Sequence, residues 1–281
     1  MRKIIKICAT IWEIAKLYPL SAYGGYKYRQ LFEGIKIYSM FIGYPRSGHS
    51  LIGALLDAHP NMIFAHELHA LKFIYAGYTK KQIYYLLIET SRINAKEGRK
   101  TKSYSYEVPN QWQGDFTKLQ VIGDKKGGGS TSILRTKPKL LSGLQNTIGT
   151  DIKFIHIVRN PFDNISTISR KTKRLKSLAD SIEYYFSLCE TTMEIKKQLK
   201  EHELFELRHE SFLENPKAHL KELCHFLGVG APDDYLNDCS GIVYKSPHKS
   251  RHQVEWSQEL IDIVEKRIDG FPFLSGYSYK D

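Results

Sequence analysis

The sequence predicts an α/β protein, a single domain with a central parallel sheet flanked by helices. Five short apolar runs rich in β-branched and aromatic residues alternate with longer helical stretches, an order typical of parallel sheets. Two of these runs end in loops rich in glycine and cations, and such sheets bind ligands at the carboxyl ends of their strands. No proline- or glycine-rich linker divides the 281 residues. We therefore expect one domain over 37–281, with a helical extension, residues 1–36, packed on it.

The N-terminal extension begins with a pattern that favours an amphipathic helix. One side of that helix is formed by Ile4, Ile7, Ile11 and Ile14. Glu13 and Lys16 interrupt the apolar run too early for a secretion signal, and no stretch approaches the ~18 apolar residues of a membrane span. The four cysteines show neither CxxC spacing nor a nearby His pair arranged like zinc ligands. We expect a cytoplasmic protein without a stable membrane anchor and without a metal.

The strand predicted over 37–43 leads into a loop with phosphate-binding spacing. Gly43 and Gly48 match the pattern G-x-x-x-x-G-K-[ST], except that His49 stands in place of the lysine. An apolar helix should follow over 50–58 and end before Pro60. The N–H groups at its start would bind an anion, helped by side chains of the loop, namely Arg46, Ser47, His49 and Ser50.

This loop lacks two features of a kinase or nucleoside triphosphatase. The lysine that reaches the β- and γ-phosphates is absent, and no acidic strand end is placed to complete a magnesium site. The alternative is a glycine-rich turn that only joins a strand to a helix. Four phosphate-compatible side chains within five positions favour the anion site.

The second and third strands also end in charged residues. A short strand over 62–65 delivers His66 and Glu67, and a strand over 119–123 opens into Lys125 and Lys126. Between them, residues 71–118 show weak periodicity, which predicts helices with a mobile loop near 97–116.

The fourth strand, 152–158, is the most clearly marked. It leads through Arg159 into a helix with Asn160 as its N-cap and Pro161 in its first turn. A fifth strand is expected over 204–207, followed by another capped helix.

The formal net charge of +11 indicates an anionic partner. The excess is uneven, because residues 1–176 carry 29 basic and 11 acidic side chains whereas residues 177–281 carry 12 and 19. Nucleic acid, a membrane surface or a phosphorylated small molecule would each satisfy this charge. The basic cluster 170–176 lacks the interleaved aromatic residues of nucleic-acid-binding segments, so we interpret it as a solvated helix face.

Several segments resemble the sulfotransferases that use 3′-phosphoadenosine-5′-phosphosulfate (PAPS). Residues 44–51 are similar to the family's loop Tyr-Pro-Lys-Ser-Gly-Thr-Thr-Trp, with Arg46 in place of the lysine. Residues 154–169 resemble the family's 3′-phosphate segment, and residues 207–216 resemble its segment Leu-Arg-Tyr-Glu-Asp-Leu, which precedes an Asn-Pro pair. The tail also resembles family C-termini, so the resemblance runs from about 37 to 279.

The resemblance implies a fold like that of the P-loop nucleotide kinases and a binding site for PAPS without a metal. The 5′-phosphosulfate would be held by the loop residues Arg46, Ser47, Gly48, His49 and Ser50. No nucleic-acid partner is implied, and the sequence leaves the oligomeric state open.

At the other end of the nucleotide, the resemblance implies that Arg159 holds the 3′-phosphate. Thr167, eight positions later, stands where the family has a hydroxyl residue, and Ser166 and Ser169 are its alternatives. The remaining contacts would come from His209, at the position of an adenine-pocket tyrosine, and from Lys249 and Arg251, in a basic loop that closes over the nucleotide.

The implied reaction moves a sulfuryl group from PAPS to a hydroxyl or amine and releases adenosine 3′,5′-bisphosphate (PAP). Arg46 and Lys125 would stabilise the charge on the leaving and transferring groups. Glu67 is the first candidate for the base that deprotonates the acceptor, and His66 is the second. The acceptor is expected to be a small metabolite, or else a saccharide, in a pocket walled by 68–116. The alternative from another class is a non-catalytic protein that binds nucleic acid or another polyanion.

Overall fold

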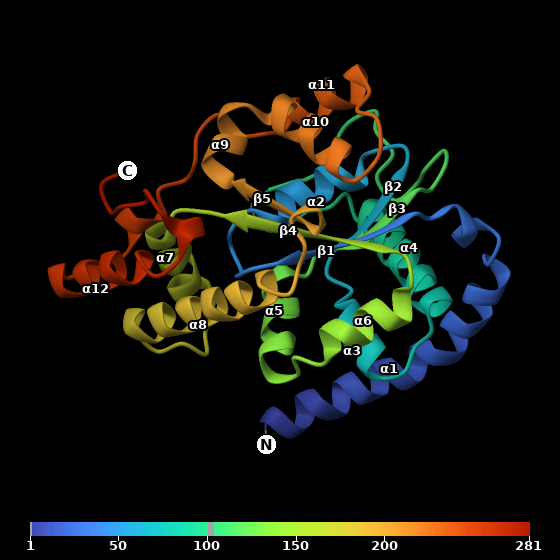
Figure 1. Ribbon diagram of the computed structural model, residues 1–281, viewed down its shortest axis with the longest axis horizontal. Coiled ribbons are helices and arrows are strands. Elements are labelled where there is room, and N and C mark those ends of the chain that lie inside the picture. The colour runs from blue at the N-terminus through green and yellow to red at the C-terminus, as the bar shows by residue number, and fades with distance from the viewer. Residues whose placement is uncertain (1, 101–103) are drawn as a thin grey trace.

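The structure is a computed structural model that describes residues 2–100 and 104–281. One parallel sheet of five strands lies at its centre (Figure 1). In spatial order the strands are β2 (Met62–Ala65), β3 (Val121–Asp124), β1 (Ile37–Ile42), β4 (Asp151–Val158) and β5 (Leu204–Arg208). Each lies within two residues of its predicted range, and the predicted fold class is confirmed.

Helices cover both faces of the sheet (Figure 1). One face carries α2 (His49–Asp57), α9 (His209–Glu214), α10 (Pro216–Phe226) and α11 (Asp233–Gly241). The other carries α1 (Arg2–Lys27), α3 (Ala70–Tyr75), α4 (Lys80–Lys96), α5 (Gly127–Thr136) and α6 (Leu140–Ile148). Beyond the carboxyl end of β4, three further helices pack together, α7 (Pro161–Lys171), α8 (Leu178–Lys196) and α12 (Gln258–Ile268). Short 3-10 helices span Leu31–Gly34, Glu201–Glu203, Ser250–Gln253 and Pro272–Leu274.

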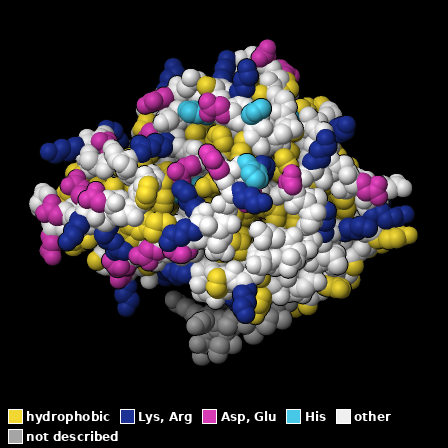
Figure 2. Space-filling view, in the orientation of Figure 1, with side chains coloured by type: hydrophobic (Ala, Val, Ile, Leu, Met, Phe, Trp, Pro, Cys, Tyr) yellow, Lys and Arg dark blue, Asp and Glu magenta, His cyan; other side chains and the backbone are white. Residues whose placement is uncertain are grey.

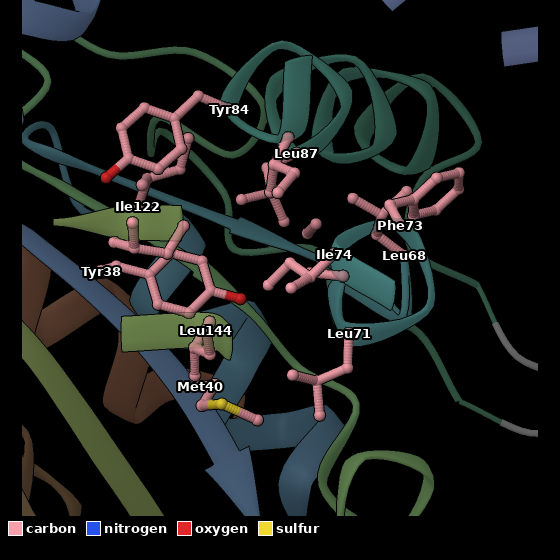
Figure 3. Close-up of a cluster of buried hydrophobic side chains, with 14 of the residues drawn as sticks. Tyr38, Met40, Leu68, Leu71, Phe73, Ile74, Tyr84, Leu87, Ile122 and Leu144 are labelled. Carbon is pink, nitrogen blue, oxygen red and sulfur yellow. The ribbon is translucent and has the colours of Figure 1, made fainter. Parts of the chain in front are cut away.

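The central strand β1 is buried on both faces because its side chains alternate between two apolar clusters. Tyr38 and Met40 face the cluster formed with α3, α4 and α6, part of which Figure 3 shows. Ile37 and Phe41 face the cluster formed with α2, α10 and α11. A predominantly apolar run is therefore needed here, although buried Ser39 interrupts it.

Helix α1 packs along α4 by its inner face. Gly24 and Gly25 permit this close approach, since a Cβ at Gly24 would lie 2.3 Å from the Tyr85 ring and one at Gly25 would lie 3.0 Å from the α4 backbone. The Tyr78 hydroxyl donates to the Ile14 carbonyl at 2.5 Å. No helix within the described ranges is long and apolar enough to cross a membrane.

The segment after α4, expected to be a mobile loop, is tied to α2 by the buried carboxylate of Asp57. This carboxylate pairs with buried Arg99 and accepts bonds from the Ser91 hydroxyl at 2.7 Å and from the Gly114 N–H at 2.9 Å. Burial raises the pKa of Asp57 to about 6, although Arg99 opposes the shift. The described parts of 97–116 are therefore anchored at both ends of the segment.

Candidate active site

The loop between β1 and α2 lies at the carboxyl edge of the sheet. Gly43, Arg46 and Gly48 have φ values of 115°, 73° and 103°, and these left-handed conformations turn the chain sharply into α2. Gly48 is the N-cap of α2, and no side chain caps this helix. The Leu51 N–H donates to the Gly48 carbonyl at 3.1 Å, and no side chain competes for the N–H groups before it. Anion binding by these groups stays a prediction.

Three distant elements hold this loop in place. The Gly43 N–H donates to the Thr131 hydroxyl of α5 at 2.8 Å, and the Asn164 amide of α7 donates to the Pro45 carbonyl at 2.8 Å. Arg159, which follows β4, donates to the Arg46 carbonyl at 3.1 Å. These bonds fix the loop before any ligand arrives, which lowers the entropic cost of binding.

Two of the four predicted side-chain donors point inward instead of toward solvent. Ser47 is buried and donates to the Tyr44 carbonyl at 3.2 Å, and its hydroxyl lies 3.2 Å from Nε2 of His49. Burial, and then the charge of Lys125, lowers the pKa of His49 to about 3, so this imidazole is neutral at pH 7. Ser47 and His49 therefore stabilise the loop from its buried side, whereas the Arg46 side chain is exposed to solvent.

On one side of the loop, Lys125 links the first turn of α2 to Glu67. Its ammonium group donates to the Ser50 hydroxyl at 3.0 Å and to the Glu67 carboxylate at 2.9 Å. Gly53 makes room for its stem, because a Cβ there would lie 2.5 Å from Cγ of Lys125. Lys125 is only 3% exposed, and burial lowers its pKa although Glu67 works against that shift.

Glu67 receives a second ammonium group, that of Lys126. Burial alone would raise the pKa of Glu67, but the two lysines outweigh burial and lower it to about 2. The residue adopts a left-handed φ of 69°, a conformation that costs energy in any residue other than glycine. The structure thus brings the predicted residues Ser50, Glu67 and Lys125 together.

His66 is half-buried beside this cluster. Burial, followed by the charge of Lys125, lowers its pKa to about 4, so it is a neutral proton acceptor at pH 7. It lines a small cavity of about 30 Å³ between α2 and the segment after α4. The other polar residues of that cavity are Asn94, Glu97, Arg99, Lys100 and Tyr106.

On the other side of the loop lie Arg159 and His209. Arg159 is 8% exposed, and besides the Arg46 carbonyl it donates to the His248 carbonyl at 2.5 Å. Its buried Nε has no partner among the described residues. A Cβ at Gly48 would lie 2.5 Å from Nδ1 of His209, which also has no partner. Burial, and then Arg159, lowers the pKa of His209 to about 3. Both unpartnered nitrogens lie next to the loop.

The hydroxyl residues of α7 divide between packing and the protein surface. Thr167 is half-buried and donates to the Asp163 carbonyl at 2.8 Å. Ser166 is buried and accepts a bond from the indole of Trp256 at 3.0 Å, so its hydroxyl is committed to packing. Thr167 and Ser169 keep partial exposure, and a contact of Thr167 with a 3′-phosphate stays a prediction.

The two tail cations, predicted to contact the nucleotide from a basic loop, are already paired within the protein. Arg251 is buried against buried Asp163, with Nη2 2.6 Å from the carboxylate, and its Nη1 donates to the carbonyls of Ser278 and Tyr279. Lys249 donates to the Asp281 carbonyl at 2.6 Å. Both line a cavity of about 230 Å³ that also touches Asn160. Their contact with a nucleotide stays a prediction.

Sequence reasoning missed the residues that hold the loop from a distance. Asn164 lies 119 residues from Pro45 and Thr131 lies 88 residues from Gly43, so no local pattern connects them. Asp163, in the first turn of α7, also fixes Arg251, a contact that its position in the sequence does not indicate. No group of three or more His, Cys, Asp or Glu side chains among residues 2–100 and 104–281 is arranged to hold a metal ion.

Several known proteins resemble this chain in sequence or in fold. The model of the sulfotransferase family matches residues 40–233. A sulfotransferase domain from the curacin biosynthetic pathway is 13% identical, with 84% of this chain and 96% of that chain covered and a TM-score of 0.56. A sulfotransferase of Mycobacterium tuberculosis is 10% identical, with 90% and 82% covered and a TM-score of 0.51. These two likenesses show a shared fold.

A mouse sulfotransferase solved with PAP is also similar, at 14% identity, 80% coverage of this chain, 69% of its own and a TM-score of 0.38. No curated protein sequence matches the chain significantly.

Proposed function

The chain belongs to the sulfotransferase family, and from that premise we propose that it transfers a sulfuryl group from PAPS to a hydroxyl or amine of a small-molecule acceptor. One observation carries the proposal. Lys125 contacts Ser50 in the first turn of α2, Arg159 contacts the backbone of the loop that leads into it, and Arg46 is exposed on that loop. Three cations and a helix N-terminus suit a ligand with several anionic groups.

The donor nucleotide has anionic groups at both ends, and the chain offers a site for each. The first turn of α2, with Arg46 and Ser50, suits the 5′-phosphosulfate. Arg159, whose buried Nε lacks a partner, suits the 3′-phosphate, with Thr167 and His209 as further contacts. A phosphate near Arg159 would supply that missing acceptor, since buried polar groups normally find partners.

Sulfuryl transfer is an in-line displacement. The acceptor oxygen or nitrogen forms a bond to sulfur while the bond from sulfur to the 5′-phosphate oxygen breaks, and that oxygen keeps the electron pair. The acceptor proton passes to a base, and PAP leaves. Arg46, Ser50 and Lys125 would stabilise the charge that develops on the leaving phosphate and on the sulfuryl group.

The two candidate bases differ in chemistry. The Glu67 carboxylate is held by two lysines and has a pKa of about 2, which makes it a weak base. His66 has a pKa of about 4, is neutral at pH 7 and lines a cavity. We therefore place His66 first as the base, and Glu67 becomes the residue that positions Lys125 and Lys126.

The cavity beside His66 supports a polar acceptor. Its walls carry Asn94, Glu97 and Lys100, and its volume of about 30 Å³ suits a hydroxymethyl-sized or amino group of a larger molecule. A small polar metabolite or one residue of a saccharide would present such a group. A cytoplasmic location stays a prediction.

The direct test is transfer of labelled sulfate from PAPS to a panel of polyols, sugars, amines and phenols. We expect transfer to a polar acceptor, and Lys125→Met should lower kcat/KM by about 100-fold or more, the usual effect of losing one charge-stabilising donor. Exposed Lys118→Met is the matched control and should change little. A protein that binds PAP tightly but labels no acceptor would contradict the catalytic proposal and leave only nucleotide binding.

A further inference from the structure

Exposed apolar side chains concentrate on α1. Among the α1 side chains that the structure describes, those of residues 12–27, five large apolar ones have half or more of their surface exposed, namely Trp12 (66%), Tyr18 (50%), Leu20 (50%), Tyr23 (66%) and Tyr26 (65%). Soluble proteins rarely expose large apolar clusters, and a cluster of this kind marks a surface that binds a protein, a membrane or a ligand. Neither nucleotide binding nor sulfuryl transfer uses this helix.

Four of the five form one stripe on the outer face of the helix. At 100° per residue, Trp12, Leu20, Tyr23 and Tyr26 fall on the side opposite Ser21, which is buried against α4. The inner face is fixed by Gly24 and Gly25 against α4 and by the ion pair from Glu13 to Lys72 at 2.9 Å. The outer stripe is therefore not part of the core.

Cations accompany the aromatic rings on this face. Lys16 lies 5.0 Å from the Trp12 ring centre, and the Arg29 guanidinium lies 4.2 Å from that of Tyr26. Lys27 is exposed beside them, and residues 14–32 contain no Asp or Glu. Figure 2 shows Lys or Arg groups and a hydrophobic group projecting side by side at the right edge, where Figure 1 places the end of α1.

We propose that the outer face of α1, from Trp12 to Arg29, binds the surface of an anionic lipid bilayer with the helix lying flat on it. Trp and Tyr are enriched at membrane interfaces, and lysine and arginine are attracted to acidic headgroups. The exposed residues of this face combine aromatic rings with cations, which suits an interface between acidic headgroups and water better than a purely apolar partner. A second copy would bring like charges together, which disfavours a dimer through this face.

The bound orientation leaves the active site open. Helix α1 covers the face of the sheet opposite α2 (Figure 1). The phosphate loop, as we call residues 43–48 for their predicted role, leads into α2 at the carboxyl edge. A protein lying on α1 would keep that loop in water. The proposal does not depend on the proposed function, because it rests on a surface that takes no part in it.

The test is sedimentation of the full chain with vesicles of phosphatidylcholine alone and with roughly one quarter phosphatidylglycerol. We expect binding to the anionic vesicles only, weakened by salt. Replacing Trp12, Tyr23 and Tyr26 together by Ser should weaken binding at least about tenfold. Replacing Lys16, Lys27 and Arg29 by Gln should weaken it by about fivefold for each charge removed.

The matched control replaces Trp112 and Ile263 by Ser, two exposed apolar residues elsewhere, and should bind like the unaltered chain. Circular dichroism confirms folding, and the cation variant tests the proposal if the aromatic variant unfolds. Absent vesicle binding, equal binding to neutral vesicles, or unchanged binding by both variants would overturn the proposal. So would light scattering that shows a dimer lost in the aromatic variant, because a second copy would then occupy the face.

Discussion

His66 and Glu67 are neighbours in the sequence, but different forces lower their proton affinities. Burial lowers the pKa of His66 by disfavouring the imidazolium, whereas two lysines lower the pKa of Glu67 by favouring the carboxylate. Both groups are therefore unprotonated in the resting protein near pH 7. In the proposed assignment, His66 is the base and Glu67 positions Lys125 and Lys126.

This difference predicts the pH profile of kcat/KM. The base must be unprotonated, and a pKa of about 4 keeps His66 unprotonated as the pH falls toward that value. The rate should stay flat down to about pH 5 and then fall, whereas an ordinary histidine would lose activity from about pH 6.5. Initial rates across this range measure it.

Two variants assign the base. His66→Gln should abolish the acid limb and most activity. Glu67→Gln should retain activity and move the limb to lower pH, because the Glu67 charge raises the pKa of His66. An inactive Glu67→Gln protein that still binds PAP, together with an active His66→Gln protein, would restore Glu67 as the base.

For single residues, the sequence predicted which side chains lie near the loop better than it predicted which way they point. Arg159 and Lys125 do lie at the phosphate loop, since strand ends and motif spacing place them there. The inward turn of Ser47 and His49 depends on packing against Phe41 and Tyr44, which spacing within the loop cannot show. The pairing of Arg251 likewise depends on Asp163, 88 residues away.

Among the elements, the phosphate loop depends most on backbone geometry at Gly48. Its φ is 103°, and a Cβ would lie 2.5 Å from Nδ1 of His209. We expect Gly48→Ala to weaken PAP binding about tenfold or more, because strain of about 1–3 kcal/mol would distort the first turn of α2. Calorimetric titration measures the affinity.

The matched control is Gly143→Ala in α6, where a Cβ meets only ordinary contacts at 4.0 Å. It should bind PAP normally and gain slightly in stability, since alanine favours helices. Equal affinities of the two variants would show that the loop does not need its left-handed glycine.

The Asp57 cluster is the second element with a measurable consequence. Asp57→Asn removes the charge that faces buried Arg99, and breaking a buried pair costs about 3–5 kcal/mol. Urea unfolding should show this loss, while Asp115→Asn, on an exposed residue, should change stability by less than about 0.5 kcal/mol. An equal effect of the two substitutions would remove Asp57 as the anchor of the segment after α4.

The strands were predictable because their apolar runs are local, and burial on both faces demands them. The segment after α4 was not, because its order comes from Asp57 and from the Gln113 amide, which donates to the Ala54 carbonyl at 2.9 Å. These partners are more than 50 residues away in the sequence. Weak periodicity was therefore a poor guide to how firmly the segment is held.

At the scale of the whole molecule, the excess of basic residues is best related to the cations at one loop. Figure 2 shows Lys and Arg interspersed with Asp and Glu over much of this face, and not gathered into one broad field. Arg46, Lys125 and Arg159 meet at one loop, which suits a compact anion better than a long polyanion. Weak binding to DNA should disappear at moderate salt, as non-specific phosphate contacts do.

The measurement that tests the central claim most directly is calorimetric titration with PAP, without a metal. We predict tight one-to-one binding that Arg159→Ala weakens by about 10- to 100-fold, the usual worth of charge-assisted hydrogen bonds to a phosphate. Arg92→Ala, on the outer part of α4, should bind like the unaltered protein. Absent PAP binding, undiminished binding by a folded Arg159→Ala variant, or stronger binding of magnesium ATP would contradict the account.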